Sequence, residues 1–214
     1  MKILSVKMHC FASNCYLVVS GSGNCAVIDP GMEPENIIAA IEENHLTPKM
    51  ILLTHGHYDH FCAVPGLQER YPEIELMAAA KEVPLLTDPK KNYSATAVGT
   101  PVTLSPDRLL KEGDKIALDE LEFLVWETPG HTAGSLTYFC GDAAFTGDTL
   151  FVQSCGRTDM YSSDFMDMVD SLTRLRSLKT NYHMYPGHEQ EGMLFDQYDW
   201  IDGLVARIRA AYGR

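Results

Sequence analysis

The segment 54–60, which reads THGHYDH, is the feature that most restricts how this chain can fold. It places three histidines and an aspartate within seven positions, directly after the apolar run MILL at 50–53. Four good metal ligands at this spacing need a joint explanation, because a fold has little reason to cluster uncharged imidazoles beside an acid without a cation. The pattern therefore predicts a buried strand that ends at a metal site.

Further residues of the same ligand types recur downstream, each after a short strand-like segment and beside a glycine. They are His131 in ETPGHTAGS, Asp148 in FTGDTL and His188 in YPGHEQ. Glycine permits the sharp turns that would bring these side chains inward. With the first motif they form a set of imidazoles and carboxylates large enough for two metal ions, namely His55, His57, Asp59, His60, His131, Asp148 and His188.

The spacing within the first motif suggests how the ligands divide. Residues two apart in an extended segment face the same side, so we expect His55 and His57 to hold one ion together. Asp59 and His60 lie beyond the turn and can hold a second ion, while the two oxygens of Asp148 suit a bridge. Imidazole and carboxylate suit zinc, iron or manganese. We therefore expect two divalent metal ions, with zinc preferred and iron or manganese as alternatives.

Composition and charge limit the class of protein. The chain has 214 residues, 45% hydrophobic and 21% charged, which predicts a single globular domain over residues 1–214. Its formal net charge of -12 disfavours a nucleic-acid partner. We found no signal-peptide pattern and no apolar run near the roughly 18 residues of a membrane span. The six cysteines form no C-x-x-C pair, as is typical of reduced thiols. We expect a cytoplasmic protein without a membrane partner; protein partners stay open.

Strand-like and helix-like segments alternate in two rounds along the chain. This pattern predicts an α/β fold in which two mixed sheets are stacked with helices outside, a four-layer αβ/βα sandwich. The loop-rich stretch 87–105 is the best candidate for a mobile lid. Strands are expected over 3–6, 15–19, 26–28, 50–53, 74–79, 115–118, 122–127, 135–140, 143–146 and 183–185, and helices over 35–44, 61–70, 164–178 and 195–212.

These motifs resemble those of the metallo-β-lactamase-fold superfamily, and within it the short, single-domain branch of glyoxalase II-like (hydroxyacylglutathione hydrolase-like) enzymes. THGHYDH matches the superfamily's T-H-x-H-x-D-H motif, and TPGHT, FTGDTLF and PGHE match its later motifs in order. VIDPG and FASNCYLV are similar to its opening strands. The resemblance implies one metal at His55, His57 and His131, a second at Asp59, His60 and His188, and Asp148 between them.

The resemblance also implies a chemistry. Two metal ions can share a water, lower its pKa and present a bridging hydroxide to a carbonyl carbon. We expect a metal-dependent hydrolase of small-molecule thioesters, since a thiolate leaves without much help. Asp59 is the expected catalytic residue, which orients the water and moves its proton. Arg157 in SCGRTDM lies where such enzymes carry a basic residue near the glutathione portion of the substrate. Asp29 resembles the family's acid that supports a metal-binding loop.

Two other functions stay open. A persulfide dioxygenase, which shares the GRTD segment, uses one iron held by two histidines and a carboxylate. A metal-binding protein of the same fold without turnover is the non-enzymatic alternative. The acyl group and the thiol also stay open, because the acidic residues that follow His188 would not attract the two carboxylates of glutathione.

Overall fold

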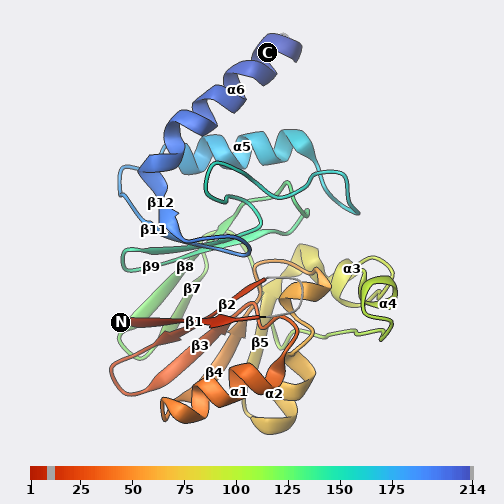
Figure 1. Cartoon of the computed structure of the whole chain (residues 1–214), viewed down its shortest axis with the longest axis vertical. Coiled ribbons are helices and arrows are strands. Elements are labelled where there is room, and N and C mark those ends of the chain that lie inside the picture. Colours follow the sequence, from red (N-terminus) through yellow and green to blue (C-terminus); the bar gives the residue numbers. More distant parts are fainter. Residues whose placement is uncertain (9–12, 213–214) are drawn as a thin grey trace.

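The structure is a computed structural model that describes residues 1–8 and 13–212. In this part of the chain two six-stranded sheets lie face to face, and helices cover their outer sides (Figure 1). The first sheet follows the order of the chain, with β1 to β3 antiparallel and β3 to β6 parallel. Its strands are β1 (Lys2–Lys7), β2 (Asn14–Val19), β3 (Asn24–Ile28), β4 (Thr47–Leu52), β5 (Glu75–Ala79) and β6 (Arg108–Leu110).

The second sheet is antiparallel except for one parallel pair, β10 with β11. Its order is β12-β11-β10-β9-β8-β7. The strands are β7 (Lys115–Leu118), β8 (Leu121–Glu127), β9 (Leu136–Cys140), β10 (Ala143–Gly147), β11 (His183–Pro186) and β12 (Gly192–Met193).

The helices lie where the sequence pattern buries an apolar face. In Figure 1, α1 (Pro34–Glu43) and α2 (Val64–Arg70) lie on the outer side of the first sheet, and α5 (Phe165–Arg176) and α6 (Tyr198–Tyr212) on that of the second. The short helices α3 (Val83–Leu86) and α4 (Ser94–Ala97) lie at one edge. Among the described residues, no helix combines the length and the apolar character that a membrane span requires.

The core consists of three apolar layers, which explains why the strands read as continuous apolar runs. Leu17 faces α1 and α2, whereas its neighbours Tyr16 and Val18 face the second sheet. A third cluster lies between the second sheet and α5 and α6. Since side chains alternate along a strand, burial on both faces requires this four-layer arrangement. The predicted αβ/βα sandwich is confirmed.

The parallel strands determine where the polar motifs meet. Asp29 follows the end of β3 and Thr54 follows the end of β4, its parallel neighbour. Asp148 and His188 likewise follow the parallel pair β10 and β11. The amide of Leu136 in the second sheet donates to the carbonyl of Thr54 in the first, at 2.8 Å. The carboxyl ends of both sets of strands therefore meet at one edge of the sandwich.

Several predicted boundaries were wrong. The helix expected from residue 61 begins at Val64, after the 3₁₀ turn η1 (Tyr58–His60). The last helix is preceded by another 3₁₀ turn, η3 (Leu194–Gln197), so it begins at Tyr198. Sequence patterns also missed β6 and β12, which are too short to show a periodicity, and α3 and α4.

The segment 87–105, expected as a lid, is tied down at its base. Asn92 is fully buried, and its side-chain amide donates to the carbonyls of Leu85 and Val102 at 3.1 and 3.0 Å. The backbone carbonyl of Asn92 accepts from the backbone amide of Tyr58 at 3.0 Å. Most residues from Thr96 to Pro101 are exposed, and the role of this segment as a lid stays a prediction.

The described cysteines carry no disulfide. Cys15, Cys25 and Cys140 are buried free thiols, and Cys62 and Cys155 are half-buried ones, as expected for reduced cysteines. Residues 9–12, which include Cys10 and the beginning of FASNCYLV, lie outside the described residues.

Candidate metal centre

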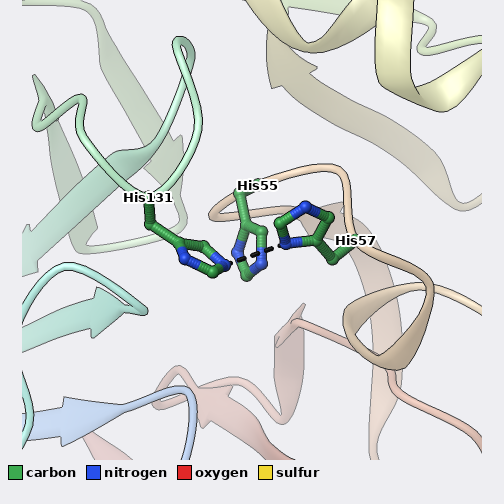
Figure 2. A group of neighbouring side chains, drawn as sticks. All are labelled: His55, His57 and His131. Carbon is green, nitrogen blue, oxygen red and sulfur yellow. Dashed lines mark hydrogen bonds between the residues drawn. The ribbon is translucent and has the colours of Figure 1, made fainter. Parts of the chain in front are cut away.

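The first cluster of ligand side chains joins the two halves of the sandwich. His55 and His57 come from the loop after β4, and His131 comes from the loop between β8 and β9 (Figure 2). All three are buried, and one ring nitrogen of each lies within 4.8 Å of the others. The closest pair is Nδ1 of His57 and Nε2 of His131, at 2.8 Å. The expected pairing of His55 with His57 thus gains a third imidazole from the second sheet.

The second cluster lies beside the first and is partly open to solvent. It consists of Asp59 and His60 from η1 and of His188 from the loop after β11. The Nε2 atoms of His60 and His188 are 3.2 Å apart, and Nε2 of His188 lies 3.3 Å from Oδ2 of Asp59. Two imidazoles and a carboxylate therefore converge here.

Asp148 lies between the two clusters. Its Oδ2 is 3.3 Å from Nε2 of His131 in the first cluster and 3.6 Å from Nε2 of His188 in the second. Its Oδ1 is 3.5 Å from Nε2 of His60. The structure thus brings together all seven residues that the sequence singled out, with one carboxylate within reach of both groups.

Hydrogen bonds orient three of the imidazoles. Nδ1 of His60 lies 3.0 Å from Oδ2 of Asp29, and Nδ1 of His131 lies 2.7 Å from the carbonyl of Arg157. The Thr54 hydroxyl donates to Asp29, so it must accept from Nδ1 of His55, 3.1 Å away. Because each Nδ1 faces an acceptor, it carries a proton, and Nε2 of the same ring is the nitrogen directed at the clusters.

The atoms directed at the clusters have the environment that a cation requires. Nε2 of His55 and Oδ1 of Asp148 are buried and form no hydrogen bond within the part of the chain that the structure describes, and Nδ1 of His57 faces Nε2 of His131 at 2.8 Å. Buried polar atoms are nearly always paired, so unpaired atoms of this kind in one cluster call for a ligand. A positively charged ion that binds imidazole nitrogen and carboxylate oxygen fits them, and the coarse expectation of divalent metal ions agrees with this donor set.

Electrostatics divide the centre into a neutral and a charged half. Burial, with neighbouring histidines, lowers the pKa of His57 to about 3 and that of His55 well below its usual value, so both imidazoles are neutral. Burial would also lower the pKa of His60, but Asp148 and Asp59 outweigh it and raise this pKa to about 10. Burial opposes ionisation of Asp59 as well, yet His60 and His188 hold its pKa below the usual range. The second half therefore attracts positive charge.

Asp29 supports the centre from behind. Its Oδ1 accepts from the amide of Thr54 at 2.7 Å, and its Oδ2 accepts from the Thr54 hydroxyl at 2.6 Å and faces His60. One buried carboxyl therefore orients His60 directly and His55 through Thr54. Asp29, His55 and His60 also lie close enough together to hold an ion. The hydrogen bonds from Thr54 already engage both oxygens of Asp29, which favours a supporting role.

Glycine is required where the loops pass the ligands. A Cβ on Gly187 would contact Oδ1 of Asp148 and lie 2.7 Å from Cε1 of His60. Gly147 has a φ of 48°, and a Cβ there would contact the Thr54 side chain. The glycines beside Asp148 and His188 therefore both serve close approach, and Gly147 also serves the turn.

A cavity of about 420 Å³ opens onto both clusters. Tyr58, Phe151, Cys155 and Met160 add apolar and aromatic surface to its wall. Arg157 also lines it and is exposed, and its guanidinium binds Asp159 through Nε–Oδ1 and Nη2–Oδ2 contacts of 2.9 and 3.0 Å. The basic residue predicted to meet the substrate thus lies at the cavity and already has an acidic partner.

Sequence reasoning missed Glu82. This buried carboxyl accepts hydrogen bonds from the amides of Gly56 and Gly134, in the two loops that carry the first cluster. The available signal was a single acid within the apolar run AAAKEVPLL. A charged residue in such a run is rarely buried without a specific partner.

Comparison with known proteins agrees with the fold and the centre. A model of the metallo-beta-lactamase superfamily matches residues 9–188. The hydroxyacylglutathione hydrolase GloC of Haemophilus influenzae is 34% identical over 88% of this chain and 91% of its own length. Other hydroxyacylglutathione hydrolases that the chain matches are longer, and it spans about 60% of their length, as with that of Vibrio cholerae.

Solved structures extend the likeness. The crystal structure of BLEG-1 B3 metallo-beta-lactamase is 30% identical with a TM-score of 0.87, over 92% of this chain and 97% of that one. The structure of TTHA1623 in a di-iron-bound form is 34% identical with a TM-score of 0.80, over 91% and 96%. The chain therefore belongs to the metallo-beta-lactamase superfamily and is a metallo-hydrolase.

Proposed function

We propose that this protein hydrolyses small-molecule thioesters of the hydroxyacylglutathione type, and that one domain over residues 1–214 carries the activity. The observation that carries the proposal is the pair of ligand clusters that share Asp148 and open into one cavity. The similarity to GloC over nearly the whole of both chains supports this substrate class. Thioesters suit a site of this kind because the leaving thiolate needs little protonation.

Two divalent ions would supply Lewis acidity for the thioester carbonyl and would lower the pKa of the attacking water. We propose zinc, with iron as the alternative that the likeness to a di-iron-bound structure supports, and manganese as a third choice. The proposed ligands are His55, His57 and His131 for one ion and Asp59, His60 and His188 for the other, with Asp148 shared.

The side chains of the protein would then divide the remaining work. Asp59 lines the cavity and is ionised near neutral pH, so it is placed to orient the attacking water and to accept its proton. Arg157 lies at the same cavity, where its planar donors suit a carboxylate of the substrate. Asp29 holds His60 and the Thr54 loop in place.

The test is hydrolysis of S-D-lactoylglutathione by protein reconstituted separately with zinc, iron and manganese. Rapid turnover with at least one metal supports the proposal. Absence of turnover with every metal would overturn it. Oxygen consumption with glutathione persulfide in the iron form would then favour the dioxygenase, and two bound ions without either activity would favour a metal-binding protein without turnover.

A further inference from the structure

Glu82 connects the two halves of the first cluster. It ends the 3₁₀ turn η2 (Ala80–Glu82), and only 1% of its surface is exposed. Its Oε2 accepts from the amide of Gly56 at 2.6 Å, and its Oε1 accepts from the amide of Gly134 at 2.8 Å. These two partners are backbone amides and not basic side chains.

The two amides belong to the loops that carry all three imidazoles. Gly56 stands between His55 and His57, and Gly134 stands three residues after His131. The first loop leaves the first sheet and the second loop leaves the second sheet. The two oxygens of one carboxyl group therefore bind two loops from different sheets. The spacing of these oxygens determines the distance between the two loops.

The approach on both sides is close enough to require glycine. A Cβ on Gly56 would lie 2.9 Å from Oε2 of Glu82, and a Cβ on Gly134 would lie 2.6 Å from Oε1 and 2.9 Å from the backbone nitrogen of Glu82. Any side chain at either position would push its loop away from the carboxyl. The contact is thus built from three positions that fit one another.

The burial of this group is unfavourable in itself. Desolvation raises the pKa of Glu82, while the hydrogen bonds from Thr132, Gly56 and Gly134 oppose the rise. An apolar side chain would pack in the surrounding AAAKEVPLL run without that desolvation, but it would leave two amides without acceptors. Compared with an apolar side chain, the carboxylate adds two hydrogen bonds of defined geometry, from the amides of Gly56 and Gly134.

We propose that Glu82 is a positioning residue that sets the separation of His57 and His131 and thereby the affinity of the first cluster for its metal ion. This inference rests on the proposed roles of His55, His57 and His131 as ligands. It predicts a selective effect: the second cluster keeps its affinity, because Asp59 and His60 lie in the turn η1, beyond the amide of Gly56 that Glu82 holds, and His188 lies in another loop.

The test is Glu82→Gln, which preserves the size of the side chain. The amide oxygen can accept one of the two N–H groups, and the NH₂ group then faces the other donor. Competition between protein and a chromophoric chelator for cobalt measures the affinity of each ion position. His131→Ala and His188→Ala identify which binding step belongs to which cluster. We expect the first-cluster affinity to fall at least 10-fold, within the range of about 10- to 100-fold known for residues that orient metal ligands, with the other step unchanged.

Asp119→Asn is the matched control. Asp119 also joins separate segments, since it accepts from the side chains of Ser20, Ser22 and Asn24. Asn24 begins β3, whereas the metal-binding loop follows the end of the parallel strand β4, so this carboxyl lies at the opposite end of the strands. We expect both metal affinities of Asp119→Asn to equal those of the wild type.

Wild-type affinities in Glu82→Gln would overturn the proposal, and so would an equal loss at both positions, which a general structural defect would cause. If Glu82→Gln does not fold, Gly134→Ala replaces it, because it keeps the carboxyl and displaces the loop; the same selective loss is expected, and unchanged affinity would overturn the proposal. A wild-type protein that binds two ions but hydrolyses no thioester would contradict the proposed function alone, and this inference would stand.

Discussion

Oδ2 of Asp29 lies 3.0 Å from Nδ1 of His60, on the side of the imidazole that faces away from the ligand cluster. Within the described site, no other carboxylate contacts a histidine on that side of its ring. Both residues are buried, at 2% and 0% exposure. The contact places the proton on Nδ1 and leaves Nε2 of His60 directed at His188. His60 is therefore held in the orientation that can bind a metal ion through Nε2.

Asp29→Asn should weaken metal binding at the second cluster by about 10- to 100-fold. The asparagine has one acceptor oxygen, so it cannot accept from both the backbone amide of Thr54, which meets Oδ1, and His60, which meets Oδ2, as the carboxylate does. Chelator competition measures the affinity. Asp107→Asn, which alters a carboxyl that accepts from the amide of Leu76, is the control and should bind metal normally. Normal affinity in Asp29→Asn would show that the contact does not orient His60.

Gly187→Ala should lose metal from the centre while the protein stays folded. The added Cβ would contact Oδ1 of Asp148 and lie 2.7 Å from His60, so one of the two ligands must move. Native mass spectrometry of the reconstituted protein counts the bound ions. Gly203→Ala, on helix α6, is a suitable control, because a Cβ at this position meets nothing within 4 Å. This variant should retain both ions. Two ions in Gly187→Ala would contradict the inferred close packing.

The ligand types could be predicted from the sequence, because imidazoles and carboxylates at the ends of short apolar strands have few other uses. The pairing of strands put these ends at one edge, so the motifs that are far apart in the chain meet. The stacked sheets were predictable for the same reason: strands such as β2 and β9 are apolar on both faces.

Partners fixed by tertiary structure could not be predicted. Nothing in AAAKEVPLL indicates that Glu82 would meet the amides of Gly56 and Gly134, since neither loop is near it in sequence. The ion pair of Arg157 with Asp159 within GRTD could not be predicted either, because two nearby charged side chains on a loop can each face solvent without contact. Short elements such as β12 depend on the neighbouring strand and leave no periodic signal.

Asp159→Asn should lower KM for thioesters of anionic thiols severalfold, with kcat nearly unchanged. The substitution frees the Arg157 guanidinium, which now holds Asp159, to bind a carboxylate of the substrate. The effect is limited because the pair is exposed, and an exposed ion pair contributes little. Steady-state kinetics with S-D-lactoylglutathione measure it. Glu42→Gln removes the partner of another exposed arginine, Arg70, and should leave KM unchanged. An unaltered KM in Asp159→Asn would argue against a substrate contact of Arg157.

The ion pair of Glu112 with Arg174 should make stability depend on pH. The hydrogen bond from Arg174 lowers the pKa of Glu112 in the folded state, although both side chains are partly exposed. A lowered carboxyl pKa stabilises the fold above the unfolded value of about 4.3, and this contribution disappears as pH falls through the lowered folded-state pKa. Glu112→Gln should therefore reduce the free energy of unfolding by less than about 1 kcal/mol at pH 7. At a pH below the folded-state pKa of Glu112, the substitution should have little effect on this free energy.

Urea unfolding of metal-free protein at both pH values measures that difference. Glu122→Gln, which removes the exposed partner of Lys115, is the control for loss of an ordinary surface pair. Arg174 also stacks on Trp126, with the guanidinium carbon 3.9 Å from the ring centre, and Glu112→Gln leaves this contact intact. A destabilisation that persists unchanged at low pH would contradict the assignment to the charge of Glu112.

Asp59→Asn should abolish turnover and preserve the fold. Asp59 lines the cavity and its Oδ2 lies 3.3 Å from Nε2 of His188, so it is placed to contact both an ion of the second cluster and the attacking water. Loss of a base of this kind lowers kcat by about 10²- to 10⁴-fold. Kinetics at saturating metal, with the bound ions counted in the same sample, separate loss of the base from loss of the ion. Asp196→Asn, in the exposed turn η3, should retain full activity. An Asp59→Asn protein with an undiminished rate would remove Asp59 from the catalytic step and leave it, at most, a ligand.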